Sequence, residues 1–196
     1  MHRLEPPIAA ISLWMSRIGG LCLLAAAVVI AFEILARKLL FLPFNVGTEL
    51  GGYALAIGAS WSFAYALLHR AHVRIDVLYR LLSPAARAVL DILALLSLAA
   101  LALLLTLHAW ETVQTSLMLN ARENTPLGTP LAVPQGLWLW GMLWFALVAV
   151  QQAVSAVLRL VQGDLGGVTR VAGPVAFEEE LDEALAEAEA RLKLAG

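Results

Sequence analysis

Residues 92–110 read ILALLSLAALALLLTLHAW, nineteen residues without Asp, Glu, Lys or Arg. A helix needs about 20 mostly apolar residues to cross the roughly 30 Å hydrocarbon core of a bilayer. The whole chain shares this character, because 61% of its 196 residues are hydrophobic and 14% are charged, against about 45–50% and about 25% in an ordinary soluble domain. The sequence therefore predicts an all-α integral membrane protein.

Three further apolar runs have a similar length, and each ends at charged residues, Pro or Gly. The predicted spans are residues 18–36, 50–68, 92–110 and 136–158. Only the first contains an acidic residue, Glu33, which stands four residues before Arg37 and is expected to pair with it. We read the first run as an anchor rather than a cleaved signal, and we expect a four-helix membrane unit over residues 18–161.

The distribution of basic residues predicts the orientation of this unit. Ten of the thirteen Lys and Arg residues precede the first span, lie between the second and third, or follow the fourth. Loops rich in Lys and Arg remain in the cytoplasm, so both termini should be cytoplasmic, with residues 1–17 at the inner interface. Trp61 and Trp144 fall deep within spans, and we expect them to pack against helices rather than mark an interface.

The inner loop between the second and third spans has the most patterned polar sequence, HRAHVRID over residues 69–76. We expect a short amphipathic helix on the cytoplasmic interface; the alternative is a plain positive-inside stop signal. The residues expected at the level of the lipid headgroups are Arg70, His72, Arg74, Asp76 and Arg80. Ser83 and Pro84 then predict the start of the next helix, as N-cap and first helical residue.

The outer loop and the C-terminal region differ in composition from the spans. Three prolines in residues 115–134 predict an extended loop, either a docking surface or a stiffened connection. Residues 162–177 are expected to be a glycine-rich linker. Residues 178–196 carry seven acidic and two basic side chains and are expected to form a cytoplasmic helix, either solvated or bound to a partner.

Several function classes are excluded by composition. Cys22 is the only cysteine, so an intramolecular disulfide, a dithiol pair and a cysteine-rich zinc site are excluded. The net charge of -2 provides no basic field for nucleic acid. No span carries paired carboxylates or a midspan proline of the kind that solute sites use, so we predict no catalytic, metal or cofactor site.

Two alternatives stay open at this point. His108 is the only histidine within a span, which leaves a membrane anchor or haem-bearing subunit of a respiratory redox complex as the rival interpretation. A self-contained exporter is the other.

The second span offers a surface for helix packing. Ala54, Gly58, Ser62 and Ala66 recur every four residues, which places small side chains on one face and lets a second helix approach closely. That face serves either internal packing or another subunit. The candidate packing residues are Glu49, Ala54, Gly58, Trp61 and Ser62.

Over roughly residues 18–161, these features resemble the small membrane subunit (DctQ type) of tripartite ATP-independent periplasmic (TRAP) transporters. The resemblance is strongest from Thr48 through Trp61 and in the motif at residues 69–76, and it continues in the proline-led start of the fourth span, residues 134–141. The chain departs from the family at residues 46–49, where a tryptophan and two consecutive acids are common, and at Ala71, where Gly is common.

The resemblance implies partners rather than an activity. In such systems a periplasmic binding protein captures a solute, usually an organic acid, and a large membrane subunit of about a dozen helices carries it inward, driven by sodium. The small subunit is required and binds the large one in the cytoplasmic (inner) membrane of a bacterium or archaeon. The resemblance therefore implies a non-catalytic scaffold, with the large subunit, the binding protein and membrane lipids as partners.

Overall fold

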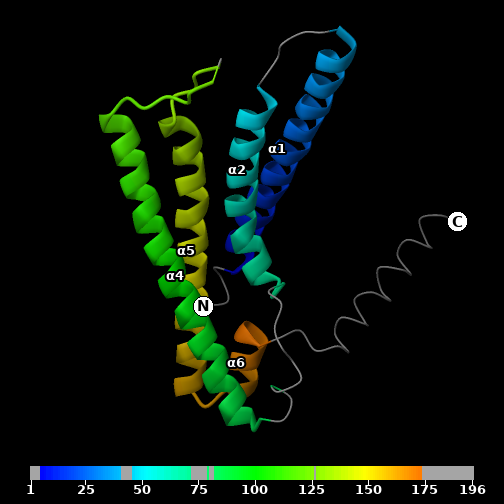
Figure 1. Ribbon diagram of the computed structural model, residues 1–196. Coiled ribbons are helices and arrows are strands. Elements are labelled where there is room, and N and C mark those ends of the chain that lie inside the picture. Colours follow the sequence, from blue (N-terminus) through cyan, green and yellow to red (C-terminus); the bar gives the residue numbers. More distant parts are fainter. Residues whose placement is uncertain (1–4, 41–45, 72–78, 80–81, 126, 174–196) are drawn as a thin grey trace, which may run out of the picture.

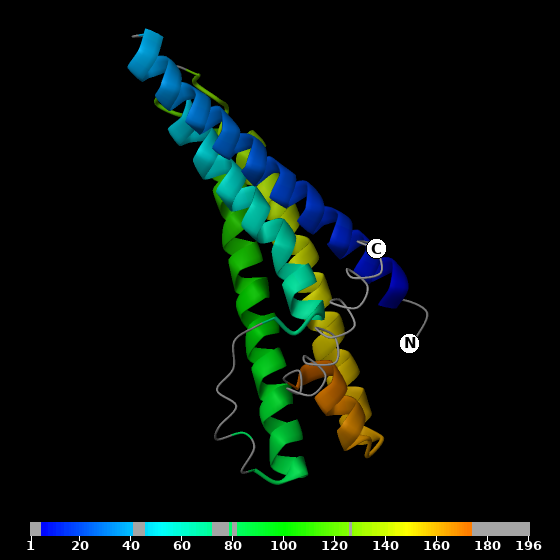
Figure 2. The same cartoon turned by 90° about the vertical axis from the view of Figure 1, so that its right-hand side faces the viewer.

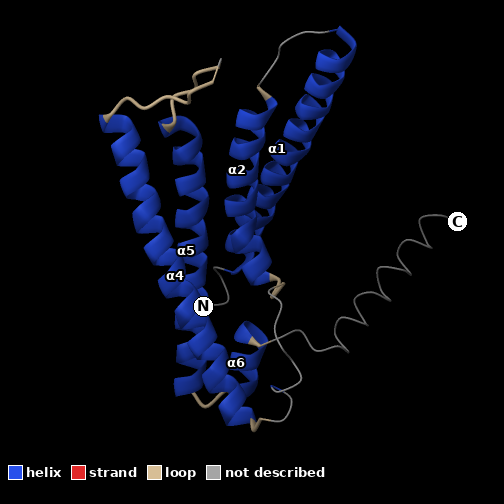
Figure 3. Ribbon diagram, viewed as in Figure 1, coloured by secondary structure: helices blue, strands red, loops and turns tan. Residues whose placement is uncertain are grey.

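The computed structural model describes residues 5–40, 46–71, 79, 82–125 and 127–173. The regular elements in these ranges are all helices, with one isolated bridge between Arg122 and Pro130. They are α1 (Glu5–Leu40), α2 (Gly47–Leu68), α4 (Pro84–Met118), α5 (Ala132–Val161) and α6 (Leu165–Ala172), shown in Figures 1 and 3. The prediction of an all-α chain is confirmed.

The long helices form two antiparallel hairpins, α1 with α2 and α4 with α5 (Figure 1). The hairpins meet along a seam between α2 and α5. They diverge toward the end where α1 finishes and α2 begins (Figure 1), which we name the outer end after the predicted orientation. At the opposite, inner end, α6 packs against both α4 and α5. The first turns of α1 also lie toward this end, and Figure 2 shows α1 running obliquely across the other helices.

Three of the described helices are long and apolar enough to cross a membrane: α1 over Pro7–Leu39, α4 and α5. They correspond to the predicted first, third and fourth spans. α2 has 22 residues, about 33 Å at 1.5 Å per residue, but it is not among the three because serines, glycines and the hydroxyl-bearing Tyr53 and Tyr65 lower its hydropathy.

The helices continue well beyond the predicted apolar runs. α4 begins at Pro84, as the Ser83–Pro84 pattern predicts, well before its apolar run at Ile92, and α1 begins at Glu5 rather than at Ile18. Apolar content marks the depth of the membrane, whereas the helix itself continues until a residue stops it. At the start of α4 the predicted cap is confirmed, because Ser83 accepts a hydrogen bond from the Ala86 amide at 3.4 Å.

The core lies mainly between α4 and α5 and is rich in alanine. Ala102, Ala149 and Ala156 are fully buried, and Leu95 and Val148 fill the space between them. The many small side chains let the two helices approach closely along their length. This hairpin is therefore a close-packed support for the rest of the molecule.

Part of the stretch predicted as a linker is helical. Asp164 caps α6 by accepting a hydrogen bond from the Gly167 amide at 2.8 Å, and Val168 and Ala172 are buried against the α4–α5 hairpin. Their spacing of four residues places both on one face of a helix. The predicted acidic tail, residues 178–196, lies outside the described residues.

The outer loop is shorter than predicted. Residues 115–118 belong to α4 and residues 132–134 belong to α5, so the non-helical part is residues 119–131. Most of the predicted interfacial helix after the second span, residues 72–78 and 80–81, lies outside the described residues.

Candidate functional site

α1 and α2 cross closely at Gly19 and Gly58. A Cβ added to Gly58 would lie 3.0 Å from the Gly19 carbonyl oxygen and 2.7 Å from Cδ1 of Leu23. Nearby, Ser16 donates a 3.4 Å hydrogen bond to Ser62, whose own hydroxyl donates to the Gly58 carbonyl at 2.7 Å. The small-residue face of α2 is therefore covered by α1.

A second crossing joins α2 to α5. Gly141 lies against α2 so tightly that an added Cβ would come within 2.6 Å of the Trp61 ring and 2.9 Å of the Ser60 backbone. One turn away, the Trp61 indole donates a 2.9 Å hydrogen bond to the Leu137 carbonyl. The tight fit at Gly141 and the hydrogen bond from Trp61 therefore fix the position of α5 along α2.

The Trp144 indole makes a corresponding bond to α1. It donates to the hydroxyl of Ser12 at 3.0 Å, and Ser12 is fully buried. The expectation that Trp61 and Trp144 pack against helices is confirmed.

Four of the five candidate packing residues are thus buried or bonded against other parts of the helical unit. Gly58 and Ser62 face α1, Trp61 bonds to α5, and Ala54 is buried four residues before Gly58. Between the two interpretations of the small-residue face, the structure places it in internal packing.

Glu33 has a role that the sequence did not reveal. Its carboxylate accepts hydrogen bonds from the backbone amides of Val46 at 3.0 Å and Gly47 at 2.5 Å, the first amides of α2. These amides have no partner within their own helix, and the positive end of the helix dipole favours a carboxylate there. The predicted ion pair with Arg37 is confirmed at 3.4 Å, so Glu33 ties the end of α1 to the start of α2.

Glu49, the fifth candidate, stands at the outer end of α2 just before its apolar residues 50–68. Its buried carboxylate accepts hydrogen bonds from the Tyr53 hydroxyl at 3.0 Å and from the Thr125 hydroxyl of the outer loop. The hydroxyls of Thr125 and Thr129 lower the pKa of Glu49, because they bond to its charged form. Glu49 and Glu123 line a polar pocket of about 300 Å³ at this end.

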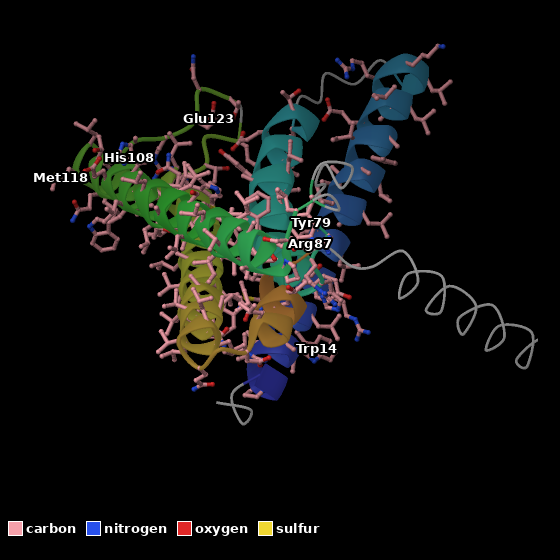
Figure 4. All side chains as sticks on the ribbon, turned by 90° about the horizontal axis from the view of Figure 1, so that it is seen from below. Trp14, Tyr79, Arg87, His108, Met118 and Glu123 are labelled. Atoms are coloured by element: carbon pink, nitrogen blue, oxygen red, sulfur yellow. The ribbon has the colours of Figure 1, made fainter. Side chains whose placement is uncertain are left out.

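At the inner end, the described residues include a buried acidic side chain that was not predicted. Asp91 is 2% exposed and accepts a 2.7 Å hydrogen bond from the hydroxyl of Tyr79. The guanidinium of Arg87 lies 5.5 Å from the centre of the Tyr79 ring, and Figure 4 shows the two side chains together. The signal was a lone acid at the start of an apolar run.

Of the residues predicted at the lipid headgroups, Arg70 lies directly after α2 with a positive φ of 52°. The others, His72, Arg74, Asp76 and Arg80, lie outside the described residues.

The side chains that could serve a redox or metal site lie apart from one another. His108 is exposed on α4, toward the Met118 end of the helix (Figure 4), and Cys22 is a half-buried free thiol on α1. Among the described residues, no three His, Cys, Asp or Glu side chains lie close enough to hold a metal ion.

An open groove of about 510 Å³ runs between α4 and α5, and its lining is almost entirely apolar. Trp140, Leu143 and Leu147 supply one wall, and Leu103 lies on the other helix. Thr106 is its one hydroxyl, which already donates to the carbonyl of Ala102 at 2.7 Å. This lining suits hydrocarbon rather than a charged solute.

Comparison with protein families identifies the chain. Residues 26–159 match the family described as tripartite ATP-independent periplasmic transporters, DctQ component. The chain belongs to the DctQ family. The match covers more than two thirds of the 196 residues and runs from within α1 almost to the end of α5. It includes the crossing of α2 with α5, whereas Gly19 on α1 lies before it. No curated protein and no solved structure matches this DctQ-family chain.

Proposed function

We propose that this DctQ-family chain is the non-catalytic scaffold subunit of a TRAP transporter. In this proposal it supports the large membrane subunit during sodium-driven, binding-protein-dependent uptake of an organic acid through the cytoplasmic membrane. The observation that carries the proposal is that the polar and small residues of the seam are engaged inside the chain, while broad apolar faces point outward.

The inward engagement extends over all four long helices. Ser12 is bonded to α5, Ser16 to α2, and Trp61 to α5. Thr106 of α4 also lies 3.2 Å from the Met142 carbonyl of α5. Hydrogen bonds between helices in a membrane each contribute roughly 0.6 kcal/mol on average, so several together favour one fixed arrangement, as a support requires.

The outward faces supply surface for a partner. In α1 only 17% of the most apolar window is buried within the chain. Leu21, Val28 and Phe32 are each more than 60% exposed on this helix. We propose that the large subunit covers part of this face, and that the internal crossings act on that contact indirectly by holding α1 in place.

The membrane topology of the proposal has four spans. α2 crosses the membrane beside α1, with its polar groups shielded by α1 and α5, and both termini are cytoplasmic. The inner loop then brings Arg70, Arg74 and Arg80 to the anionic headgroups, where each basic residue contributes about 1 kcal/mol.

Reconstitution tests this function. Proteoliposomes containing the large subunit, with binding protein, solute and an inward sodium gradient outside, should take up solute only when this chain is also present. Vesicles holding this chain alone should take up none. Equal uptake with and without the chain, or uptake by the chain alone, would contradict the scaffold role.

A variant makes the same test specific to the seam. Gly141→Leu inserts a side chain where Ser60 and Trp61 leave no room, and it should reduce uptake by the complete system. Gly136→Leu is the matched control, because a Cβ at Gly136 meets nothing within 4 Å. Equal uptake by the two variants would count against the seam as the feature that supports transport.

A further inference from the structure

The loop between α4 and α5 is longer than its connection requires. It spans residues 119–131, thirteen residues between two antiparallel neighbours that about 2–8 residues usually join. In Figure 1 the loop does not simply turn over the ends of α4 and α5 but extends sideways toward α2. The extra length therefore calls for an explanation.

The described part of the loop, residues 119–125 and 127–131, has a built conformation. The Glu123 amide donates to the Thr129 carbonyl and the Leu131 amide donates to the Ala121 carbonyl, each at 3.0 Å. The Arg122 guanidinium donates to the Gly128 carbonyl at 3.1 Å. These bonds cross the loop from one arm to the other, so its described part is a small hairpin held together by its own hydrogen bonds.

The far end of this hairpin is attached to α2. The Thr125 hydroxyl donates to the carboxylate of Glu49, and the Tyr53 hydroxyl donates to the same carboxylate at 3.0 Å. Glu49 is only 7% exposed, so it does not swing freely, and an attachment to it is an attachment to α2.

The attachment lies at the end where the two helical hairpins diverge (Figure 1). Deeper in the molecule the seam is closed by Gly141 against Ser60 and by the bond from Trp61 to Leu137. Toward the outer end α1–α2 and α4–α5 diverge (Figure 1), and there the loop spans the gap.

We propose that residues 119–125 and 127–131 form a strap that sets the separation of the two helical hairpins at the outer end, with the contact from Thr125 to Glu49 as its latch. When the latch is closed, the outer ends of α2 and α5 keep a single separation. When it opens, the hairpins pivot about the seam near Gly141. This inference rests on contacts within the chain and is independent of the proposed transport role.

Distances between the outer tips of the hairpins test the strap. Leu39→Cys on α1 and Met118→Cys on α4 place spin labels at exposed positions away from the latch, in a Cys22→Ala background. The full chain is reconstituted in lipid nanodiscs, and the label distance distribution is recorded by pulsed electron paramagnetic resonance. Intact chain should give one narrow distribution.

Removing the latch from either side should lengthen the mean distance and broaden the distribution. Thr125→Val removes the donor and Glu49→Ala the acceptor, and the double variant should match the single ones. Thr125→Ser keeps the hydroxyl and should restore the narrow distribution. Thr112→Val is the matched control, because the Thr112 hydroxyl bonds only within α4, to the His108 carbonyl.

The outcomes separate cleanly. A shift in Thr125→Val that Thr125→Ser reverses supports the strap even if Glu49→Ala does not fold. Unchanged distributions in Thr125→Val, or an equal shift in Thr112→Val, would overturn it.

Discussion

Replacing Gly58 by Ala should lower the free energy of unfolding, by an amount set by the crossing of α1 and α2. The added Cβ would lie 2.7 Å from Cδ1 of Leu23 and 3.0 Å from the Gly19 carbonyl oxygen. The Leu23 side chain can rotate away, but the oxygen belongs to the backbone of α1, so the two helices must separate. Overpacking of this kind costs about 1–3 kcal/mol.

Ala also favours the helix over Gly by about 1 kcal/mol, so a matched variant is needed to isolate the contact. Gly52→Ala provides it on α2, because a Cβ there meets nothing within 4 Å. The difference between the two variants cancels the intrinsic gain and leaves the 1–3 kcal/mol of crowding, roughly 2–12 °C in melting temperature.

The assay is thermal unfolding of the purified full chain in mild detergent, followed by the helical circular dichroism signal. Gly19→Ala and Gly20→Ala form a second matched pair on α1, in which only Gly19 faces Gly58. Equal melting temperatures for Gly58→Ala and Gly52→Ala would refute the crossing as the reason for the small-residue face.

Three further predictions concern polar contacts. Glu33→Ala should lower the melting temperature, because removing a capping side chain costs about 0.5–2 kcal/mol. The exposed Glu111→Ala should not, and equal effects would contradict the cap. Trp61→Phe keeps the ring but loses the bond to the Leu137 carbonyl, so it should cost about 1 kcal/mol in the same melts, and an unchanged melt would count against that bond. The pKa of Glu49 is lowered below its ordinary value of 4.5, so the ionised carboxylate stabilises the fold above pH 4.5, and this contribution is lost as the pH falls through the folded-state pKa. The difference in melting temperature between wild type and Glu49→Gln should therefore shrink over that acidic range. A constant difference would show that ionisation of Glu49 is not involved.

The sequence predicts the elements of this fold better than their ends. The first, third and fourth predicted apolar runs correspond to helices that are long and apolar enough to cross a membrane, because length and composition alone carry that signal. The same signal could not show that α1 starts at Glu5, since a helix continues until a residue stops it, whereas Ser83 and Pro84 did predict the start of α4. α2 falls outside the three membrane candidates because its glycines, serines and tyrosines lower its hydropathy.

Pairwise contacts were predictable only when they were local in sequence. The bond between Glu33 and Arg37 spans one helical turn and was expected, but the cap on α2 depends on two segments meeting in space. The spacing of Ala54 and Gly58 indicated a close helix contact without naming α1 as the neighbour. Nothing in the sequence connected Thr125 to Glu49, which lie 76 residues apart.

The central claim, that the chain is the scaffold of a TRAP transporter, is tested most directly by what accompanies it from the membrane. The tagged full chain is expressed beside its native neighbouring genes, extracted gently in detergent, and its companions are identified by mass spectrometry. A membrane protein of about a dozen helices should be recovered with it in near-equal amount. Recovery of the chain alone, or together with a redox enzyme, would contradict that claim and return attention to His108.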